Sequence, residues 1–442
     1  GEGRTGIRVA VGAARVDEAP PMSGLIATGR ATDLDAIDWA TLAAGSGQRG
    51  PDARGDNARG SGSPLQLLRV DVSADRLKLL GGSFANARVR AAPSAAGTAV
   101  QVDGDTLAGL LTLPRASGAA ITGQFSRVHW AAPSAPAAVA APPTPSTVAP
   151  DPAAAVDPAR IPALQFTIDD LRFGNAVLGR TTLRTQPVAG GLRIAELRTA
   201  TEPHKIAVTG DWLGTGVAER TRIKVQVTSG DFGKLLSGFG FGGRLAGGTG
   251  EATFDAAWPS NPAGFSLGTL EGRLSLLARD GRLIEIEPGA GRVLGLLSVA
   301  ELPRRLLLDF RDFFSKGFAF NRIGGNVRFA AGQARSDDLV IDGPAAEIRI
   351  TGAADLRAQT FDQTIAVLPK SGNLLTVAGA LAGGPVGAAV GAVANAVLRK
   401  PLGEAGAKIY RVTGPWTDPR VEVGKHENAD VRQAADAPAA AE

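Results

Sequence analysis

The sequence predicts a mainly β fold with few helices, and three observations support this. Polar and apolar residues alternate strictly in several runs, such as RIKVQVT from Arg222 to Thr228 and EIRIT from Glu347 to Thr351. Successive side chains of a strand point to opposite faces, so each run places aliphatic side chains on one face and charged ones on the other. Glycine (58 residues) and proline (28 residues) are abundant, which suits many strands joined by turns. Helical periodicity, finally, is rare along the chain.

The first part of the chain divides into a strand region and a linker. Residues 1–130 are predicted to be strands, interrupted at 45–64 by a flexible loop rich in Gly, Ser, Asp and Arg. Residues 131–160 are rich in alanine and proline, which predicts an extended linker or loop. The sequence begins with no initiator methionine, basic segment or apolar leader, and it alternates like a strand at once. We therefore expect it to be a piece of a longer protein.

The second part contains the clearest strands and the few predicted helices. Residues 161–370 alternate as strands, with a helical insert at 288–316. Residues 371–400 form an apolar segment rich in glycine and alanine, which we expect to be helical. Residues 401–424 are predicted to be the final strands, and residues 425–442 a disordered tail.

Four runs carry the same signature of an aliphatic residue, threonine and glycine. They are Ile121–Gly123, Val208–Gly210, Ile350–Gly352 and Val412–Gly414. Glycine suits a strand exit, where the backbone often needs a positive φ or a bulge. We therefore interpret the signature as the end of a strand, repeated irregularly along the chain.

The scarcity of helices leaves two arrangements for the apolar sheet faces. Two sheets can close on each other as a sandwich, or one long curved sheet can keep an open apolar face for something that is not protein. Periodicity alone favours the sandwich, because most apolar sheet faces are ordinary protein core.

Composition excludes several classes of function. The chain has 47 basic and 43 acidic residues, scattered rather than clustered, which argues against nucleic acid as a partner. It has no cysteine, so disulfides, thiolate metal sites and cysteine nucleophiles are excluded.

The short motifs that suggest catalysis lack the context that they need. Residues 264–268 match the G-x-S-x-G nucleophile elbow around Ser266, but an alternating strand follows instead of a helix. Residues 238–243 match G-x-G-x-x-G, yet they follow a short predicted helix and are better interpreted as its end. His129, His204 and His426 have no ligand spacing. We predict no catalytic residue, no metal and no cofactor, and hence a binding, scaffolding or transport role.

The stretch from Asp231 to Val423 resembles the C-terminal region of the YhdP family, AsmA-like proteins of the Gram-negative envelope. The resemblance rests on several blocks in the family's order. They are GFGFGGRLAGGTGEATFDAAWP (238–259), DGRLIEIEPGAGRVLGLLSVAELPRRLLLDFRDFFSKGFAFNRIGG (280–325), DDLVIDGPAAEIRITGAADL (337–356), LAGGPVGAAVGA (381–392) and YRVTGPWTDPRVEV (410–423). Before Leu164 only the general style of strands and turns is similar.

The resemblance implies the open arrangement: a long curved antiparallel sheet whose apolar groove shields phospholipid acyl chains between the inner and outer membranes. It also implies a periplasmic location, with the full-length protein anchored in the inner membrane through the polypeptide that precedes this chain. Under this interpretation one face of the alternating strands lines the groove. The expected lining residues are Leu192, Ile194, Ile206, Val208, Ile223, Val225, Val227, Leu274, Leu276, Val327, Phe329, Ile348 and Ile350.

Two other functions stay open on the residues alone. The first is a structural or interaction module, a closed β-sandwich that carries no lipid. The second is a hydrolase that uses Ser266, for which no His/Asp pair has a suitable context.

The apolar segment 374–398 has no charged residue and is long enough to span a bilayer. Gly383, Gly384 and Pro385 interrupt it near the middle, so that neither half is long enough alone. We expect a helical hairpin or kinked helix that touches the inner leaflet of the outer membrane, or else one that plugs the end of the sheet. The expected contact residues are Leu374, Leu375, Val377, Leu381, Val386, Val390, Val393, Val397 and Leu398.

Overall fold

A computed structural model describes most of the chain and shows a mainly β protein. The described residues are 6–13, 15–35, 67–79, 82–116, 118–131, 157–284, 317–370 and 408–423. The predicted loop at 45–64, the helical insert at 288–316, the segment 374–398 and the tail at 425–442 lie outside them. The residues fall into two compact units. Unit 1 contains 1–227, 237–240 and 257–265, and unit 2 contains 228–236, 241–256 and 266–442.

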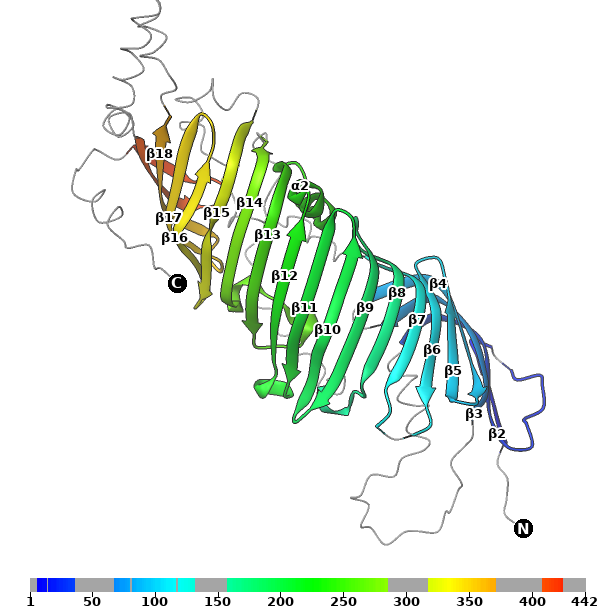
Figure 1. Cartoon of the computed structure of the whole chain (residues 1–442). Coiled ribbons are helices and arrows are strands. Elements are labelled where there is room, and N and C mark those ends of the chain that lie inside the picture. The colour runs from blue at the N-terminus through cyan, green and yellow to red at the C-terminus, as the bar shows by residue number, and fades with distance from the viewer. Residues whose placement is uncertain are drawn as a thin grey trace, which may run out of the picture. The chain divides into compact units, whose positions relative to one another are not determined.

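Unit 1 is built on the strands β1 to β12 (Figure 1). Their bounds are β1 Gly6–Val11, β2 Gly24–Asp35, β3 Leu67–Leu79, β4 Gly82–Ser94, β5 Gly97–Asp103, β6 Leu107–Pro114, β7 Ile121–Trp130, β8 Leu164–Phe173, β9 Ala176–Val188, β10 Gly191–Thr201, β11 His204–Leu213 and β12 Arg220–Ser229. Consecutive strands lie side by side, and β3 to β7 and β8 to β11 are joined as antiparallel hairpins.

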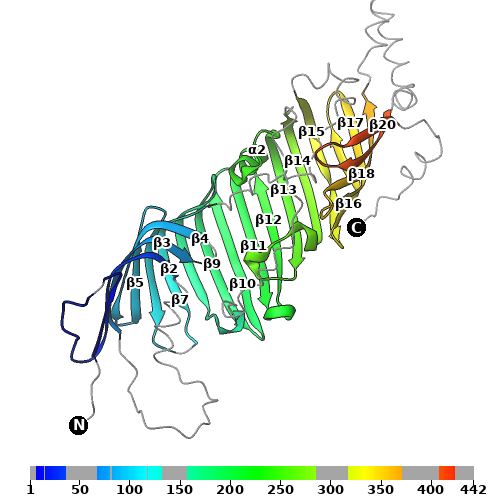
Figure 2. The same ribbon diagram turned by 180° about the vertical axis from the view of Figure 1, so that it is seen from behind.

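Unit 2 is built on the strands β13 to β20, which Figure 2 shows from behind. Their bounds are β13 Leu245–Trp258, β14 Glu271–Leu283, β15 Phe318–Ala330, β16 Gln333–Asp342, β17 Ala346–Asp355, β18 Thr360–Pro369, β19 Lys408–Pro415 and β20 Arg420–Val423. From β14 to β20 every neighbouring pair is antiparallel. The short helix predicted near Asp231 is α2, Phe232–Leu236, which continues as one π-helical turn, Ser237–Phe241.

The turns show why neighbouring strands form hairpins. Ala331 and Gly332 join β15 to β16 with φ values of 52° and 78°. Two positive φ values are the signature of the type I′ turn, whose twist matches that of antiparallel strands. Such tight turns keep sequential strands adjacent, and the sheet grows by one strand at a time.

The prediction of a mainly β fold with an open, curved sheet is confirmed. Within each unit the described strands form one sheet, not the two facing sheets of the sandwich that periodicity alone favoured. The sheet is mixed, because β1–β2, β2–β3 and β7–β8 are parallel pairs. Parallel neighbours need a connection long enough to return the chain to the strand's starting end. The loop at 45–64 and the Ala/Pro-rich residues 131–160 fall in two of these connections.

The interpretation of the Thr-Gly signature as a strand end is wrong for most of its copies. Gly123 lies at the beginning of β7, and Gly210 and Gly352 lie inside β11 and β17. A Cβ on Gly123 would lie 2.9 Å from the ring of Phe166 on the neighbouring strand. Only Gly414 lies beside a strand terminus. At Gly123, glycine is needed because the adjacent strand crowds the position.

Candidate functional site

The candidate site is an apolar face of the sheet, and β12 shows how the sequence creates it. Ile223, Val225 and Val227 alternate with Arg222, Lys224 and Gln226. The three aliphatic side chains are half-buried, whereas the three polar ones are exposed. Since alternate residues share a face, β12 has one apolar and one polar side. We call the side of unit 1 that carries Ile223, Val225 and Val227 the apolar face of unit 1, and the side of unit 2 that carries Leu274 and Ile350 the apolar face of unit 2.

Strand register extends the apolar face across the middle of unit 1. Leu192 lies opposite Trp212, Ile194 opposite Gly210, and Thr199 opposite Ile206. A bulge between Ile194 and Leu197 shifts the alternation by one residue, so that Leu197 lies opposite Val208 on the same face. A Cβ on Gly210 would lie 3.1 Å from Cγ2 of Ile223. The side of β11 that carries Gly210 therefore continues onto the side of β12 that carries Ile223. The predicted lining residues of unit 1 therefore share one face. They are Leu192, Ile194, Ile206, Val208, Ile223, Val225 and Val227.

The predicted residues of unit 2 also share one face. Leu274 lies opposite Val327, and Leu276 and Ala278 follow on the same side of β14. Ala278 is opposite Ile323, and Ile323 is opposite Ile341 on β16. Ile341 in turn lies opposite Ile348 on β17, and Leu339 lies opposite Ile350. Registers thus bring together residues that lie up to 76 positions apart in the sequence, from Leu274 to Ile350.

Burial separates the predicted residues into two groups. Leu192, Ile206, Val327, Phe329, Ile348 and Ile350 are all at most 9% exposed, with Ile348 at 0%. The remaining residues are half-buried: Ile194, Val208, Ile223, Val225, Val227, Leu274 and Leu276. In unit 1 the half-buried row on β12, together with Ile194 and Val208, is therefore the part of the predicted lining that the protein covers only partly.

Sequence reasoning missed the apolar residues at the start of unit 1. A single cluster of buried side chains extends from β2 to β8 on the apolar face. It consists of Leu34, Ala74, Leu77, Phe84, Ala87, Val102, Leu107, Phe125, Val128 and Ile168, with Trp130 and Phe166 packed against it. Alternation in Val70-Asp71-Val72 and Ala87-Arg88-Val89 could have found part of it, because the same signal predicted the residues on β10 to β12.

The opposite face of unit 1 is polar and held by ion pairs. Asp71 on β3 accepts hydrogen bonds from Nε of Arg88 at 2.8 Å and from Nη2 of Arg69 at 2.9 Å. These bonds, led by the one from Arg88, lower the pKa of Asp71 to about 2, although burial opposes the shift. Across the parallel pair β7–β8, Nε2 of His129 lies 2.8 Å from Oδ2 of Asp170. Hydrogen bonds from Arg172 and then from His129 lower the pKa of Asp170.

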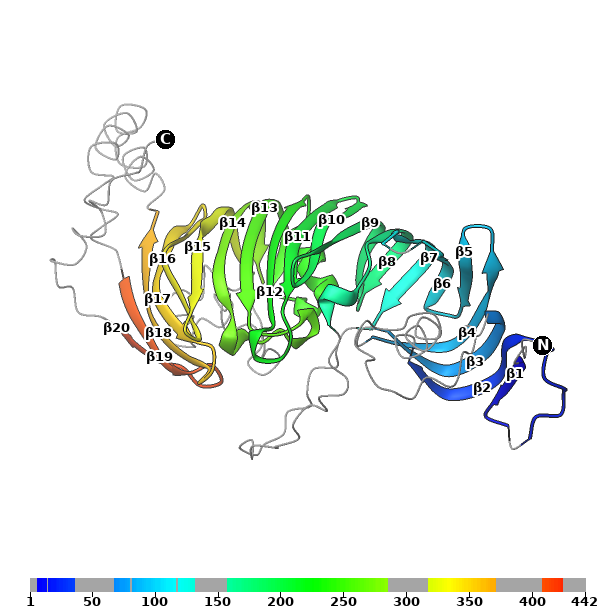
Figure 3. The ribbon, with the colours of Figure 1, turned by 90° about the horizontal axis from the view of Figure 1, so that it is seen from below.

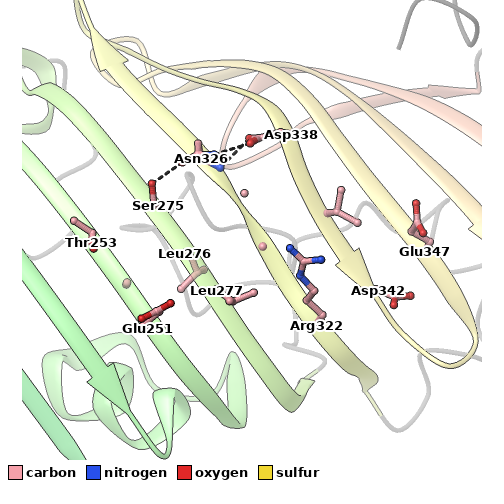
Figure 4. Close-up of a pocket in the computed structure, with 14 residues that line it drawn as sticks. Glu251, Thr253, Ser275, Leu276, Leu277, Arg322, Asn326, Asp338, Asp342 and Glu347 are labelled. Atoms are coloured by element: carbon pink, nitrogen blue, oxygen red, sulfur yellow. Dashed lines mark hydrogen bonds between the residues drawn. The ribbon is translucent and has the colours of Figure 1, made fainter. Parts of the chain in front are cut away.

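Unit 2 has a depression on its polar face, with a volume of about 490 Å³ (Figure 4). Along one side, Oγ of Ser275 donates to Oδ1 of Asn326 at 2.5 Å, and Nδ2 of Asn326 donates to Oδ2 of Asp338 at 2.6 Å. Arg322 lies at the other end, near Asp342 and Glu347. Within the described ranges no group of three or more acidic or histidine side chains is placed to hold a metal ion. Leu276 and Leu277 also line the depression.

The structure places the rejected motifs in settings that do not match their catalytic use. Ser266 lies between two single-turn 3-10 helices, Pro262–Gly264 and Leu267–Thr269, and not between a strand and a helix. Gly238 and Gly240 belong to the π-helical turn, where Gly240 has a φ of 91°. His204 is buried at the start of β11, and His426 lies outside the described residues.

The expected membrane contact residues cannot be placed, because 374–398 falls outside the described residues. Among the helices of the described ranges, none has the length and apolar character that crossing a membrane requires.

The comparisons with known proteins agree with each other. A family model described as YhdP protein matches residues 3–421, nearly the whole chain. The intermembrane phospholipid transporter YhdP of Escherichia coli (strain K12) is 28% identical over 218 residues. This match covers 49% of the present chain but only 17% of the transporter, so it spans less than a fifth of that relative. No solved structure matches the chain.

Proposed function

Because the chain belongs to the YhdP family, we propose that it is the part of an intermembrane lipid conduit that shields phospholipid acyl chains on its apolar face. The relative from Escherichia coli is described as an intermembrane phospholipid transporter, which supports a role in lipid transport. In this proposal the apolar face is the inside of a groove, and the chain works in the periplasm. The preceding polypeptide anchors it in the inner membrane, and the segment 374–398 contacts the inner leaflet of the outer membrane.

The half-buried row Ile223, Val225 and Val227 carries the proposal. The protein covers these aliphatic side chains only partly, whereas it covers the side chains of a core completely. An acyl chain laid along them gains about 0.8 kcal/mol for each CH₂ group removed from water. Such binding needs a continuous apolar surface and no ion-specific or nucleophilic group.

A structural module without lipid is the second candidate, and one observation favours it. Ile348 and Ile350 in unit 2 are buried to 0% and 5% exposure, as in an ordinary protein core. If the apolar face is covered in this way along its whole length, it stabilises the protein and leaves no room for an acyl chain.

Site-specific photo-crosslinking in the full-length protein distinguishes these functions. A photoreactive diazirine side chain is placed at Val225, and the adducts formed in living cells are extracted and identified by mass spectrometry. We expect phospholipid adducts at Val225, since its side chain lies on the half-buried part of the apolar face.

Gln226 provides the matched control, because it is the next residue of the same strand and faces the polar side. The same diazirine at Gln226 is expected to give no phospholipid adduct above background. Equal yields at both positions, or protein adducts alone at Val225, would contradict a lipid-binding apolar face and favour the structural module.

A further inference from the structure

Strand register traces an unbroken row of apolar positions across unit 1, from β3 to β11. On β3 to β6 the row consists of Val70, Ala91, Val100 and Leu111, each opposite the next. Leu111 lies opposite Gly123 on β7, and Gly123 lies opposite Phe166 on β8. On β9 to β11 the row continues, in the same way, with Leu183, Leu197 and Val208. We call these residues the cross-strand row.

The ring of Phe166 keeps the cross-strand row continuous at its one glycine. A Cβ on Gly123 would lie 2.9 Å from Cδ1 of Phe166 and 3.0 Å from Cε2 of Phe125. The two phenylalanine rings meet edge to face at 80°, with their centres 5.6 Å apart. The rings thus fill the place of the side chain that Gly123 lacks, so the parallel pair β7–β8 presents one apolar surface.

A neighbouring row on the same face is buried instead. It lies two residues from the cross-strand row on each strand, and we call it the inner row. Val89 and Gly109 of the inner row are half-buried. Its other members are at most 9% exposed: Val72, Val102, Phe125, Ile168, Thr181, Thr199 and Ile206. In the cross-strand row, by contrast, every side chain larger than that of alanine is half-buried.

Curvature of the sheet covers the inner row in the first part of unit 1. The strands β4 and β7 are three strand spacings apart, which is about 14 Å in a flat sheet. Yet the rings of Phe84 on β4 and Trp130 on β7 are 5.5 Å apart. Figure 3 shows β2 to β7 wrapping round instead of lying in one plane. Val102 of the inner row belongs to the buried cluster that contains Phe84, and so it is enclosed by this curved region.

The cross-strand row forms the border of that cluster. Val100, Leu111 and Phe166 pack against the buried side chains but are themselves only partly buried. Each of these side chains therefore rests on the protein core on one side and is partly open on the other. An acyl chain that lies along them meets a firm apolar surface without displacing any core residue.

The cross-strand row has the extent of a path instead of a single pocket. From β3 to β11 it crosses eight strand spacings, about 38 Å along the sheet. All of its side chains are aliphatic or aromatic, and none is polar. Partly open apolar surface of this extent marks a binding site for a ligand or a partner.

We propose that the cross-strand row is the track along which acyl chains pass through unit 1, and that the inner row is core that contacts no lipid. Lipid then moves from strand to strand, in the direction in which the strands follow one another. The track extends the proposed site from β12 to β3, and so to strands where no lining residue was predicted. This inference rests on the proposed lipid-binding function.

Two matched pairs of positions test the track by crosslinking in the full-length protein. Val100 and Val102 are both valines of β5 on the same face, one in each row. With the diazirine side chain at Val100 we expect phospholipid adducts, as at Val225, and at Val102 at least fivefold fewer. Val208 and Ile206 give the same comparison on β11, with adducts expected at Val208.

A charge on the row tests whether lipid moves along it. Leu183 on β9 is half-buried and lies between Val100 and Val208 in the row. Leu183→Asp is expected to lower the adduct yield at least fivefold at one of these two positions and to leave the other unchanged, because burying the carboxylate under a passing acyl chain is costly. The position that keeps its adducts identifies the end from which lipid enters. Thr182→Asp is the control, since Thr182 faces the polar side beside Arg198, and both yields are expected to stay unchanged.

The outcomes separate the track from the function beneath it. Equal yields at Val100 and Val102 would overturn the track and leave lipid binding standing, and so would adducts at Val225 with none at Val100. Unchanged yields at Val100 and Val208, or equal losses at both, in a Leu183→Asp protein with intact strands by circular dichroism would also overturn it. If that variant does not fold, the two matched pairs decide the matter. Absence of lipid adducts at Val225 as well as in the cross-strand row would instead overturn the proposed function.

Discussion

At the scale of single residues, Asp71 forms a bidentate ion pair with Arg88 on the polar face. Its side chain is 10% exposed and lies between two arginines. Arg88 holds both carboxylate oxygens, with Nε at 2.8 Å from Oδ1 and Nη2 at 3.0 Å from Oδ2, and this paired geometry favours the ionised form. The interaction joins β3 to β4 on the side opposite to Leu77 and Phe84, and so it supports the curved region from its outer side.

The lowered pKa of Asp71 predicts a pH dependence of stability. A carboxyl group with a folded-state pKa of about 2, against an ordinary 3.8, stabilises the folded protein above about pH 4. That stability is lost as the pH falls from about 5 to about 2. The shift corresponds to about 2 kcal/mol before screening, which the exposed arginines reduce to about 1 kcal/mol. We expect Asp71→Asn to lower the free energy of unfolding by about 1 kcal/mol at pH 7, measured by urea denaturation.

Asp75 provides the control for this measurement, because its ion pair with Arg30 is on the same face but far more exposed. Asp75→Asn is expected to change the free energy of unfolding by less than about 0.5 kcal/mol. The difference between the Asp71 variant and the unchanged protein should vanish near pH 2. A difference that persists at pH 2 would show that the carboxylate charge is not its source.

At the scale of strands, two neighbouring glycines of β15 differ in what surrounds them. Gly325 has a φ of 154°, and a Cβ there would lie 2.6 Å from Cα of Leu339 on β16. Gly324 has no such backbone neighbour, since the nearest atom to a Cβ is the guanidinium Nε of Arg322 at 3.4 Å. The adjacent strand therefore approaches Gly325 too closely for any other residue, whereas Gly324 has space.

This contrast predicts opposite tolerance to alanine. Gly325→Ala is expected to lower the free energy of unfolding by about 2 to 3 kcal/mol, because the backbones of β15 and β16 must separate. Gly324→Ala is expected to stay within about 0.5 kcal/mol of the unchanged protein, since a flexible arginine can move aside. Thermal unfolding of both variants provides the measurement. Equal losses would mean that the register between β15 and β16 is not as described.

The alternating pattern predicted which side chains share a face of the sheet, but not whether other groups cover that face. Alternation in Ile223-Lys224-Val225 fixes which side chains share a face, because the period of a strand is two. It does not tell whether that face is open or covered, and Val225 and Ile350 differ in this respect although their local patterns are alike. Binding of lipid by these residues stays a prediction.

Two features were beyond local patterns altogether. The contact between Phe84 and Trp130 depends on curvature accumulated over β4 to β7, which no local run of residues encodes. The sheet was predicted to be antiparallel, which is wrong for β1–β2, β2–β3 and β7–β8, because the same alternation occurs in parallel and antiparallel pairs. The long segments before β3 and β8 were the available signal, because only parallel neighbours need such a return connection.

At the scale of the whole molecule, the proposed function requires an apolar path without interruption. A single charge on the path is enough to test this requirement. An acyl chain that lies over an ionised carboxylate removes water from it, and burying an unpaired charge is costly. A structural module has no such requirement. A charge at a half-buried position reduces its stability only modestly, and its function survives while it stays folded.

Val225→Asp in the full-length protein is therefore expected to abolish phospholipid transfer between the membranes while the amount of folded protein stays within about twofold of normal. Val225 is suited to this change because its side chain is half-buried, so that the aspartate keeps contact with water. The measurement is the transfer of pulse-labelled phospholipid to the outer membrane in cells that depend on this protein. Gln226→Asp places the same charge one residue away on the polar face and is expected to transfer lipid normally, and Val225→Leu is expected to do so as well. Normal transfer by a folded Val225→Asp protein would exclude an acyl-chain path over β12, since the carboxylate would then lie where the acyl chain must pass.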